Sequence, residues 1–362
     1  MRNAVVIALD WTIVWRSEFD GIMDILMKRY HQVIKKLCCS LALWYGLGVM
    51  AHANFPWETV KYNGVDYVTL RSVKDFYYFN KIRYGAVITM ESPGLAMEVR
   101  PGTQRCRMNG VLFILSYPVI EQNGRYLLSR TDLNKLVDPI MRPTYIHSAR
   151  HFNTVVLDAG HGGKDSGSLG PYENEKVYTL RVARLAREIL QKKGYRVVMT
   201  RDSDISVSLE NRVRIANRYP DAIFISIHFN SSNSRANGIE TFTISPVGVP
   251  HMGREVKLRD FNTVPGNSMG SASIALATAA HSRALMYLNN QSTGNNFSIE
   301  DRGIKRARYN VLTGIKIPAI LFEGGFLSNR NEAAKIRTPA YQQTLAVAIA
   351  RAVDIYKKST AK

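Results

Sequence analysis

The sequence predicts an α/β protein: a mostly parallel sheet flanked by helices on both faces, preceded by a small α+β domain. From about residue 154 onward, short apolar runs alternate with longer segments of helical periodicity, which is typical of strands and helices in turn. The apolar runs are nearly continuous, as in strands that are buried on both faces. Before residue 130, repeated Asn-Gly pairs indicate β-hairpins in the smaller part.

The larger domain is expected to span residues 151–358. Its expected strands are short and apolar, and they cover residues 154–159, 196–200, 222–229, 239–244 and 318–322. Helices are expected over residues 175–193, 208–218 and 271–288, and at the C-terminus. The first helix has a shared apolar face made of Tyr178, Val182, Leu185 and Ile189. The last helix has a similar face made of Leu345, Ala348, Ile349, Ala352, Val353 and Tyr356.

Residues 54–145 are predicted to form the small α+β accessory domain. Asn63-Gly64, Asn109-Gly110 and Asn123-Gly124 each lie between β-forming residues, and both residues of such a pair tolerate positive φ. The first and third pairs are each followed by a short helical stretch, Leu133–Val137 in the second case. This pattern resembles the small module at the N-terminus of copper amine oxidases. Because the segment has no catalytic constellation, the expected role is that of a spacer or a wall-targeting module.

Residues 1–53 predict an export signal behind an upstream extension. From Met27 the chain has a basic start, an apolar run over residues 37–50 and the ending Ala51-His52-Ala53, which together make a secretory signal peptide. The apolar run is shorter than the roughly 20 residues that a membrane span needs. We therefore expect a start at Met27, cleavage after Ala53, and an exported protein of the periplasm or cell wall without a stable membrane span. An uncleaved membrane anchor is the alternative.

The charge balance indicates an anionic partner. Lys and Arg number 48 against 29 Asp and Glu, which gives a formal net charge of +19. Nucleic acid, an anionic membrane face and an anionic wall polymer all fit this charge. Export and the lack of a basic–aromatic array argue against nucleic acid, and a charge that only keeps the surface soluble is the remaining alternative. Cys106 is the only cysteine after residue 53, so no internal disulfide is expected.

Four polar side chains are expected at the carboxyl edge of the sheet. His161 follows the first strand in a glycine-rich turn, Glu175 opens the next helix, His228 ends the third strand and Glu323 ends the last. Parallel strands end at the same edge, so these residues can converge there. Two imidazoles and one carboxylate leave a fourth position for water on zinc. A second carboxylate can take the proton of that water and pass it to a leaving amine.

Six segments follow one another in this domain, namely Asp158–Asp165, Glu175-Lys176 with Leu180, Thr200-Arg201, Ser226–Ser231, Asp301–Gly303 and Glu323–Asn329. Together they resemble the zinc-dependent N-acetylmuramoyl-L-alanine amidases of bacterial cell walls, over residues 153–357. The resemblance implies Zn²⁺ held by His161, Glu175 and His228, with Glu323 as the catalytic acid/base. The implied reaction is hydrolysis of the amide between the lactyl group of N-acetylmuramic acid and the L-alanine of the stem peptide, with peptidoglycan as substrate.

Two other functions stay open at this stage. The first is a zinc peptidase or deacetylase that acts on another wall amide, and the second is a protein that binds the wall without cutting it. Glu173 is an alternative ligand to Glu175, although the spacing to Lys176 and Leu180 favours Glu175. The other histidines, such as His251 and His281, lack a ligand-like context and are expected to be structural or at the surface.

Residues 247–271 depart from the family pattern, because they are longer and more polar than the expected strand-to-helix connection. In some relatives a segment here covers the site until a partner protein removes it. A protein activator is therefore among the expected partners, with Glu255 or Asp260 as the blocking residue. A plain surface loop is the alternative.

Overall fold

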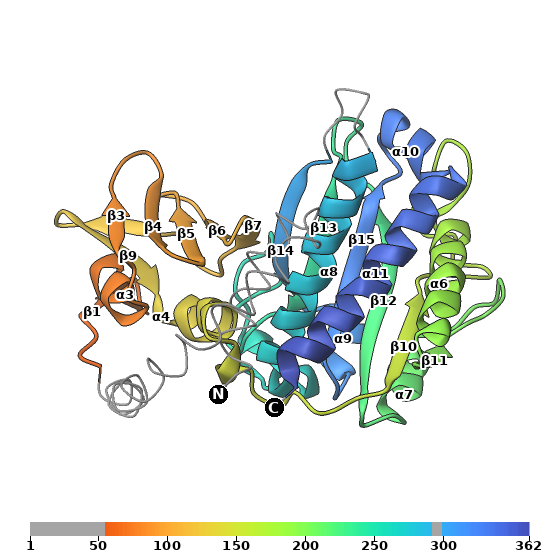
Figure 1. Cartoon of the computed structure of the whole chain (residues 1–362), viewed down its shortest axis with the longest axis horizontal. Coiled ribbons are helices and arrows are strands. Elements are labelled where there is room, and N and C mark those ends of the chain that lie inside the picture. Colours follow the sequence, from red (N-terminus) through yellow and green to blue (C-terminus); the bar gives the residue numbers. More distant parts are fainter. Residues whose placement is uncertain (1–54, 292–298, 362) are drawn as a thin grey trace, which may run out of the picture. The chain divides into compact units, whose positions relative to one another are not determined.

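Figure 1 shows the computed structural model of the chain, which describes residues 55–291 and 299–361. The predicted export segment, residues 1–53, lies outside these described residues. Within them, no helix combines the length and the apolar character needed to cross a membrane.

The described chain forms two compact units, and their boundary differs from the expected one at residue 145. The first unit contains the residues up to Thr103 together with Pro118–Arg130, and the second contains Gln104–Tyr117 and everything from Thr131 onward. The hairpin of β6 (Arg105–Met108) and β7 (Val111–Ile114) thus belongs to the second unit. The reason is that β7 pairs with β14 (Asp301–Ala307), far away in sequence, and a local hairpin signal cannot reveal such a partner.

The first unit consists of short antiparallel strands and one helix. A four-stranded sheet has the order β1 (Thr59–Tyr62), β2 (Val65–Thr69), β9 (Arg125–Ser129) and β8 (Ile120–Gln122). A second antiparallel set contains β3 (Lys81–Arg83), β4 (Ile88–Ser92) and β5 (Leu95–Val99). The helix α3 (Leu70–Phe76) follows β2 directly.

The predicted hairpins are confirmed in both units. Asn63, Asn109 and Asn123 have φ values of 46°, 47° and 52°, and each Asn-Gly pair joins two antiparallel strands. The predicted helix after the third pair is also present, as the consecutive turns α4 (Arg130–Asp132), η1 (Leu133–Val137) and α5 (Asp138–Met141).

The second unit contains a mixed sheet. Its strands have the order β11 (Arg196–Met199), β10 (Thr154–Ala159), β12 (Ala222–Asn230), β15 (Ala319–Phe326), β13 (Ile239–Ile244), β14, β7 and β6. The strands β11, β10, β12 and β15 are parallel, as predicted. However, β13 is antiparallel to β15, so the sheet is less parallel than predicted. The link from β12 to β13 is short and contains no helix, and such a link cannot return the chain in the same direction.

Helices cover both faces of this sheet, as predicted. The long helices α6 (Glu175–Lys192), α8 (Gly270–Gln291) and α11 (Pro339–Thr360) form one layer, in which α11 packs between the other two (Figure 1). The short helices α7 (Leu209–Asn217) and α9 (Asn310–Gly314) pack on the opposite face, in a core that includes Phe224 and Leu321. The remaining short helical segments are η2 (Pro143–Tyr145), η3 (Leu258–Phe261), η4 (Pro265–Met269) and α10 (Arg330–Ile336).

The alternation of side chains along the strands decides where the polar residues point. Phe224 and Leu321 face α7 and α9, and residues two or four positions further along the same strand face the same way. This rule places His228 on β12 and Glu323 on β15 on the side of the short helices, at the carboxyl ends of both strands. The parallel pairing of β12 and β15 puts these two residues directly opposite one another.

The buried face of α6 is rotated slightly from the predicted one. Tyr178 and Val182 are buried, but the buried stripe continues through Ala186 and Leu190. Leu185 and Ile189 are only half-buried. By contrast, every predicted face residue of the C-terminal helix is buried.

This rotation predicts different costs for two leucines on α6. Leu190→Ala should lower the free energy of unfolding by about 2–5 kcal/mol, because the Leu190 side chain is fully buried and its removal leaves a cavity. Leu185→Ala should cost roughly 1 kcal/mol, since much of its side chain is already in water. Urea denaturation of both variants tests this, and equal costs would contradict the assigned face.

Candidate metal centre

The turn after β10 holds His161 in an uncommon backbone conformation. His161 has a φ of 60°, which costs a non-glycine residue on the order of 1 kcal/mol. Two buried arginines hold this turn by its carbonyl oxygens. Arg212 donates to Ala159 and His161 at 2.7 and 2.6 Å, and Arg201 donates to Ala159 and Gly160 at 2.9 and 2.8 Å. The conformation of His161 is therefore set by a rigid buried support.

Asp158 supplies the counter-charge beneath this turn. Its carboxylate pairs with Arg212 at 2.5 Å and accepts hydrogen bonds from the hydroxyls of Thr200 and Ser226 at 2.6 and 2.7 Å. Burial raises the pKa of Asp158, but Arg212 and the two hydroxyls outweigh this effect and lower it. The sequence predicts no specific role for Asp158, although an acid inside an apolar strand indicates a buried partner.

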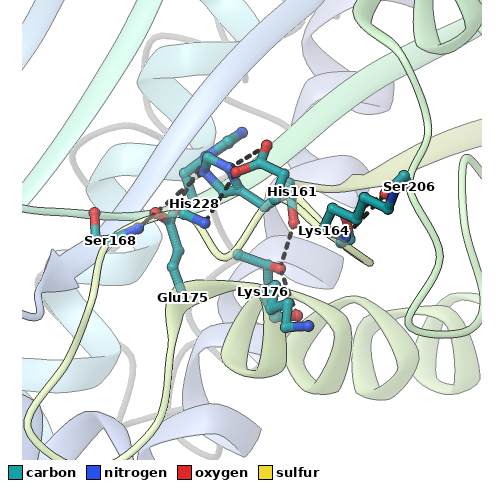
Figure 2. Close-up of polar contacts among 12 residues, drawn as sticks. His161, Lys164, Ser168, Glu175, Lys176, Ser206 and His228 are labelled. Carbon is teal, nitrogen blue, oxygen red and sulfur yellow. Dashed lines mark hydrogen bonds and ion pairs between the residues drawn. The ribbon is translucent and has the colours of Figure 1, made fainter.

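Glu175 lies between the two histidines, at the start of α6 (Figure 2). Its Oε2 is 3.1 Å from Nε2 of His161, and its Oε1 is 2.8 Å from Nδ1 of His228. The same two oxygens accept hydrogen bonds from the backbone N–H groups of Ser168 and Phe229, at 2.8 and 3.0 Å. Burial raises the pKa of Glu175, yet the hydrogen bonds and charges of the two histidines lower it far below its usual range.

Asp165 orients the first histidine from behind. Its Oδ2 is 2.8 Å from Nδ1 of His161, which leaves Nε2 of the same ring facing Glu175. Burial lowers the pKa of His161, but Glu175 and then Asp165 outweigh it and raise the pKa. A carboxylate behind a histidine is the usual outer partner of a metal ligand, because it fixes the ring and increases its basicity.

Two glycines leave room for these side chains. A Cβ on Gly160 would lie 2.3 Å from Cε1 of His228, and a Cβ on Gly167 would lie 2.6 Å from both Oε2 of Glu175 and Cδ2 of His161. No side chain fits at either position unless the cluster moves. The glycines of this segment are thus required by the packing of the cluster itself.

The cluster has the composition of a metal centre. One ligand atom from each of His161, Glu175 and His228 lies within 4.8 Å of the others, and no other such group occurs among residues 55–291 and 299–361. Each close contact between a histidine nitrogen and an oxygen of Glu175 requires a proton between the two atoms. A metal cation can take the place of these protons. Two imidazoles and one carboxylate form a ligand set typical of catalytic zinc, so these residues fit the metal that the sequence predicts.

Glu323 lies beside this cluster with one oxygen unused. The side chain is 8% exposed, and its Oε2 has no hydrogen-bond partner. Burial, followed by the charges of Glu175 and Glu240, raises the pKa of Glu323 well above its usual range, although Lys305 acts in the opposite direction. A buried carboxyl oxygen without a partner destabilises the fold, and such groups are concentrated at functional sites.

The neighbouring acid, Glu240, forms ion pairs with two cationic side chains. It lies opposite Glu323 in the antiparallel pair of β13 and β15. Its Oε1 is 2.6 Å from both Nε of Arg302 and Nζ of Lys305, and its Oε2 accepts from the amide of Asn230. The sequence does not reveal the role of Glu240, because no local pattern shows that β13 runs antiparallel beside β15.

The other candidate residues lie apart from the cluster. Glu173 forms an exposed ion pair with Arg181, at 2.5 and 2.8 Å. In the 247–271 segment, the hydrogen bond from Arg254 lowers the pKa of the buried Asp260 to about 2, and Glu255 is exposed. His281 is buried between Thr241 and Asp301. In this conformation neither Asp260 nor Glu255 is part of the metal cluster.

A cleft of about 640 Å³ opens over the cluster. Its lining includes the three proposed ligands, Glu323, and residues from α7 and α9 such as Leu209 and Val311. The cleft therefore lies on the sheet face that the two short helices cover, at the carboxyl edge of the parallel strands.

The fold and the site thus define an α/β protein with a two-histidine, one-carboxylate centre beside an unpaired acid. The family model of N-acetylmuramoyl-L-alanine amidases matches residues 155–354, which contain all four of these side chains. Because the match covers more than half of the chain, the protein belongs to this family.

Similarity to individual relatives covers about the same part of the chain. The chain is 32% identical to the protein YqiI of Bacillus subtilis, over 56% of this chain and 84% of that protein. It is 33% identical to the endolysin of Bacillus phage SPP1, over 57% and 68% of the two chains. It is 29% identical to the N-acetylmuramoyl-L-alanine amidase AmiC of Escherichia coli, but spans only 59% of that protein. The catalytic domain of CwlV from Paenibacillus polymyxa shares 32% identity, with 57% of this chain covered and a TM-score of 0.45.

The position of Glu175 predicts a clear difference between two neighbouring glutamates. Glu175→Gln should weaken zinc binding by roughly a hundredfold or more, since it removes the anionic ligand. Glu173→Gln should leave zinc binding unchanged, because Glu173 contacts only Arg181 on the surface. Competition titrations against a chromophoric chelator measure both affinities, and the opposite pattern would make Glu173 the ligand.

Glu332 holds the ends of β13 and β15, the strands that carry Glu240 and Glu323. Its carboxylate accepts hydrogen bonds from the backbone N–H of Gly238, before β13, and from that of Phe326, at the end of β15. Burial raises the pKa of Glu332 to about 7, although these two N–H groups and the charges of Lys335 and Arg302 act in the opposite direction. No pattern in the sequence predicts this role of Glu332.

The raised pKa of Glu332 predicts a loss of stability at neutral pH. The folded state binds this proton more tightly than the unfolded state, whose glutamate has a pKa near 4.5. The stabilisation by this bound proton is complete below pH 4.5 and is lost as the pH rises through about 7. The free energy of unfolding should fall by about 3 kcal/mol over this range. Urea unfolding between pH 5 and 8 should show this slope in the wild type and not in Glu332→Gln. An identical slope in both proteins would assign the effect to another group.

Proposed function

We propose that this protein is an exported, zinc-dependent peptidoglycan amidase that cleaves the bond between N-acetylmuramic acid and the L-alanine of the stem peptide. The observation that carries the proposal is the convergence of His161, Glu175 and His228 beside the unpaired carboxyl of Glu323, in an open cleft. Membership of the amidase family supports the choice of bond. The N-terminal signal pattern supports export.

Each residue has a distinct part in this reaction. His161, Glu175 and His228 would hold Zn²⁺, which makes water a nucleophile at neutral pH and polarises a carbonyl. Glu323 would act first as a base, from its carboxylate form. Glu323 takes a proton from water as the oxygen attacks the lactyl carbonyl carbon. It then gives that proton to the alanine nitrogen as the C–N bond breaks, which balances the hydrolysis.

The buried position of Glu323 favours this enzyme over a protein that only binds the wall. A binding protein gains nothing from a buried carboxyl whose Oε2 has no partner, because this group costs folding free energy. Cleavage of another wall amide remains the alternative reaction, since the same residues serve any amide.

The products of a peptidoglycan digest test this proposal. Purified sacculi treated with the zinc-loaded protein should release stem peptides that begin with L-alanine, detected by mass spectrometry. Glu323→Gln should reduce the rate by roughly 10²–10⁴-fold, since it removes the acid/base and keeps the shape. Full activity in this variant would refute the mechanism, and products with other termini would support the alternative amide.

A further inference from the structure

One polar group on the cleft wall has no role in the mechanism above. Tyr309 caps the start of α9 and lines the same cleft as Glu323 and the proposed ligands. Its hydroxyl has no hydrogen-bond partner among the described residues. Unlike the unpartnered hydroxyls of Tyr178 and Tyr356, it is not enclosed by protein atoms. A half-buried ring with a free hydroxyl in a cleft is available to a bound molecule.

The ring of Tyr309 is held in place by two neighbours. Phe242 of β13 and His251 make edge-to-face contacts with it, with centroid distances of 5.4 and 5.0 Å and interplanar angles of 85° in both cases. His251 is itself fixed, because its Nδ1 accepts the backbone N–H of Arg308 at 3.1 Å. The ring therefore loses little conformational freedom when a ligand binds. Binding then costs little side-chain entropy at this position.

The hydroxyl of Tyr309 is protonated at neutral pH, as that of any ordinary tyrosine is, and its surroundings favour this form further. Burial, and then the carboxyls of Glu323 and Glu240, raise the pKa of Tyr309 to about 12. At neutral pH the group is thus a neutral donor within the electrostatic reach of the proposed acid/base. Tyr309, Glu323 and the proposed ligands line one cleft, so a substrate bound in it can contact all of them.

We propose that Tyr309 contacts the substrate and donates a hydrogen bond to the carbonyl oxygen of the scissile amide. This proposal rests on the amidase function proposed above and adds a second polarising group to it. The oxygen gains negative charge as water attacks, so the hydrogen bond is stronger in the transition state than in the bound substrate. His251 is the positioning residue, since it acts on the reaction only through the ring of Tyr309.

Steady-state kinetics on a soluble muropeptide test the contact. Tyr309→Phe should lower kcat by about tenfold or more and change KM little, as expected for one neutral hydrogen bond made mainly in the transition state. Zinc affinity and the urea midpoint should stay at wild-type values. Tyr219→Phe is the matched control, because Tyr219 packs against the same core outside the cleft and should leave kcat unchanged.

A double-mutant cycle tests the role of His251. His251→Ala should lower kcat in the wild type and have no further effect in the Tyr309→Phe background. An unchanged kcat in Tyr309→Phe, or additive losses in the cycle, would overturn the proposal. If the wild type itself released no product, the amidase function would fail instead, so the two failures are distinguishable.

Discussion

The contact of the Glu175 carboxylate with two imidazoles is the constraint on which the site depends. Its two oxygens take four contacts, two from histidine nitrogens and two from backbone N–H groups, so the carboxylate is fixed in a single orientation. That orientation requires α6 to begin where the turn after β10 meets the carboxyl end of β12. Gly160 and Gly167 permit the approach, and Arg201 and Arg212 hold the opposing turn. The support lies in the sheet and its first helix, which are rigid elements.

Two carboxyls at the end of the sheet have opposite environments. Glu240 is paired with Arg302 and Lys305, whereas Glu323 on the adjacent strand keeps an unpartnered oxygen and a raised pKa. Different surroundings of this kind allow identical side chains to take separate roles in an enzyme. The negative charge of Glu240 is structural, whereas the unpartnered carboxyl oxygen of Glu323 is available for chemistry.

The sequence predicted the parts of the site that lie at the ends of parallel strands. His161, Glu175, His228 and Glu323 lie together because β10, β12 and β15 are parallel and adjacent, which their apolar runs indicated. The role of Glu240, the pairing of β7 with β14, and the packing of Tyr309 against His251 were not predictable. Each depends on a direction or a long-range pairing that no local pattern encodes, such as the reversal of the chain between β12 and β13.

Anomalous diffraction at the zinc edge, from crystals of the zinc-loaded protein, tests the central claim most directly. We expect one strong peak bonded to Nε2 of His161, Nδ1 of His228 and a carboxylate oxygen of Glu175, with Nδ1 of His161 still on Asp165. A peak bonded to Glu173 or Asp260, or no peak between the two histidines, would contradict it.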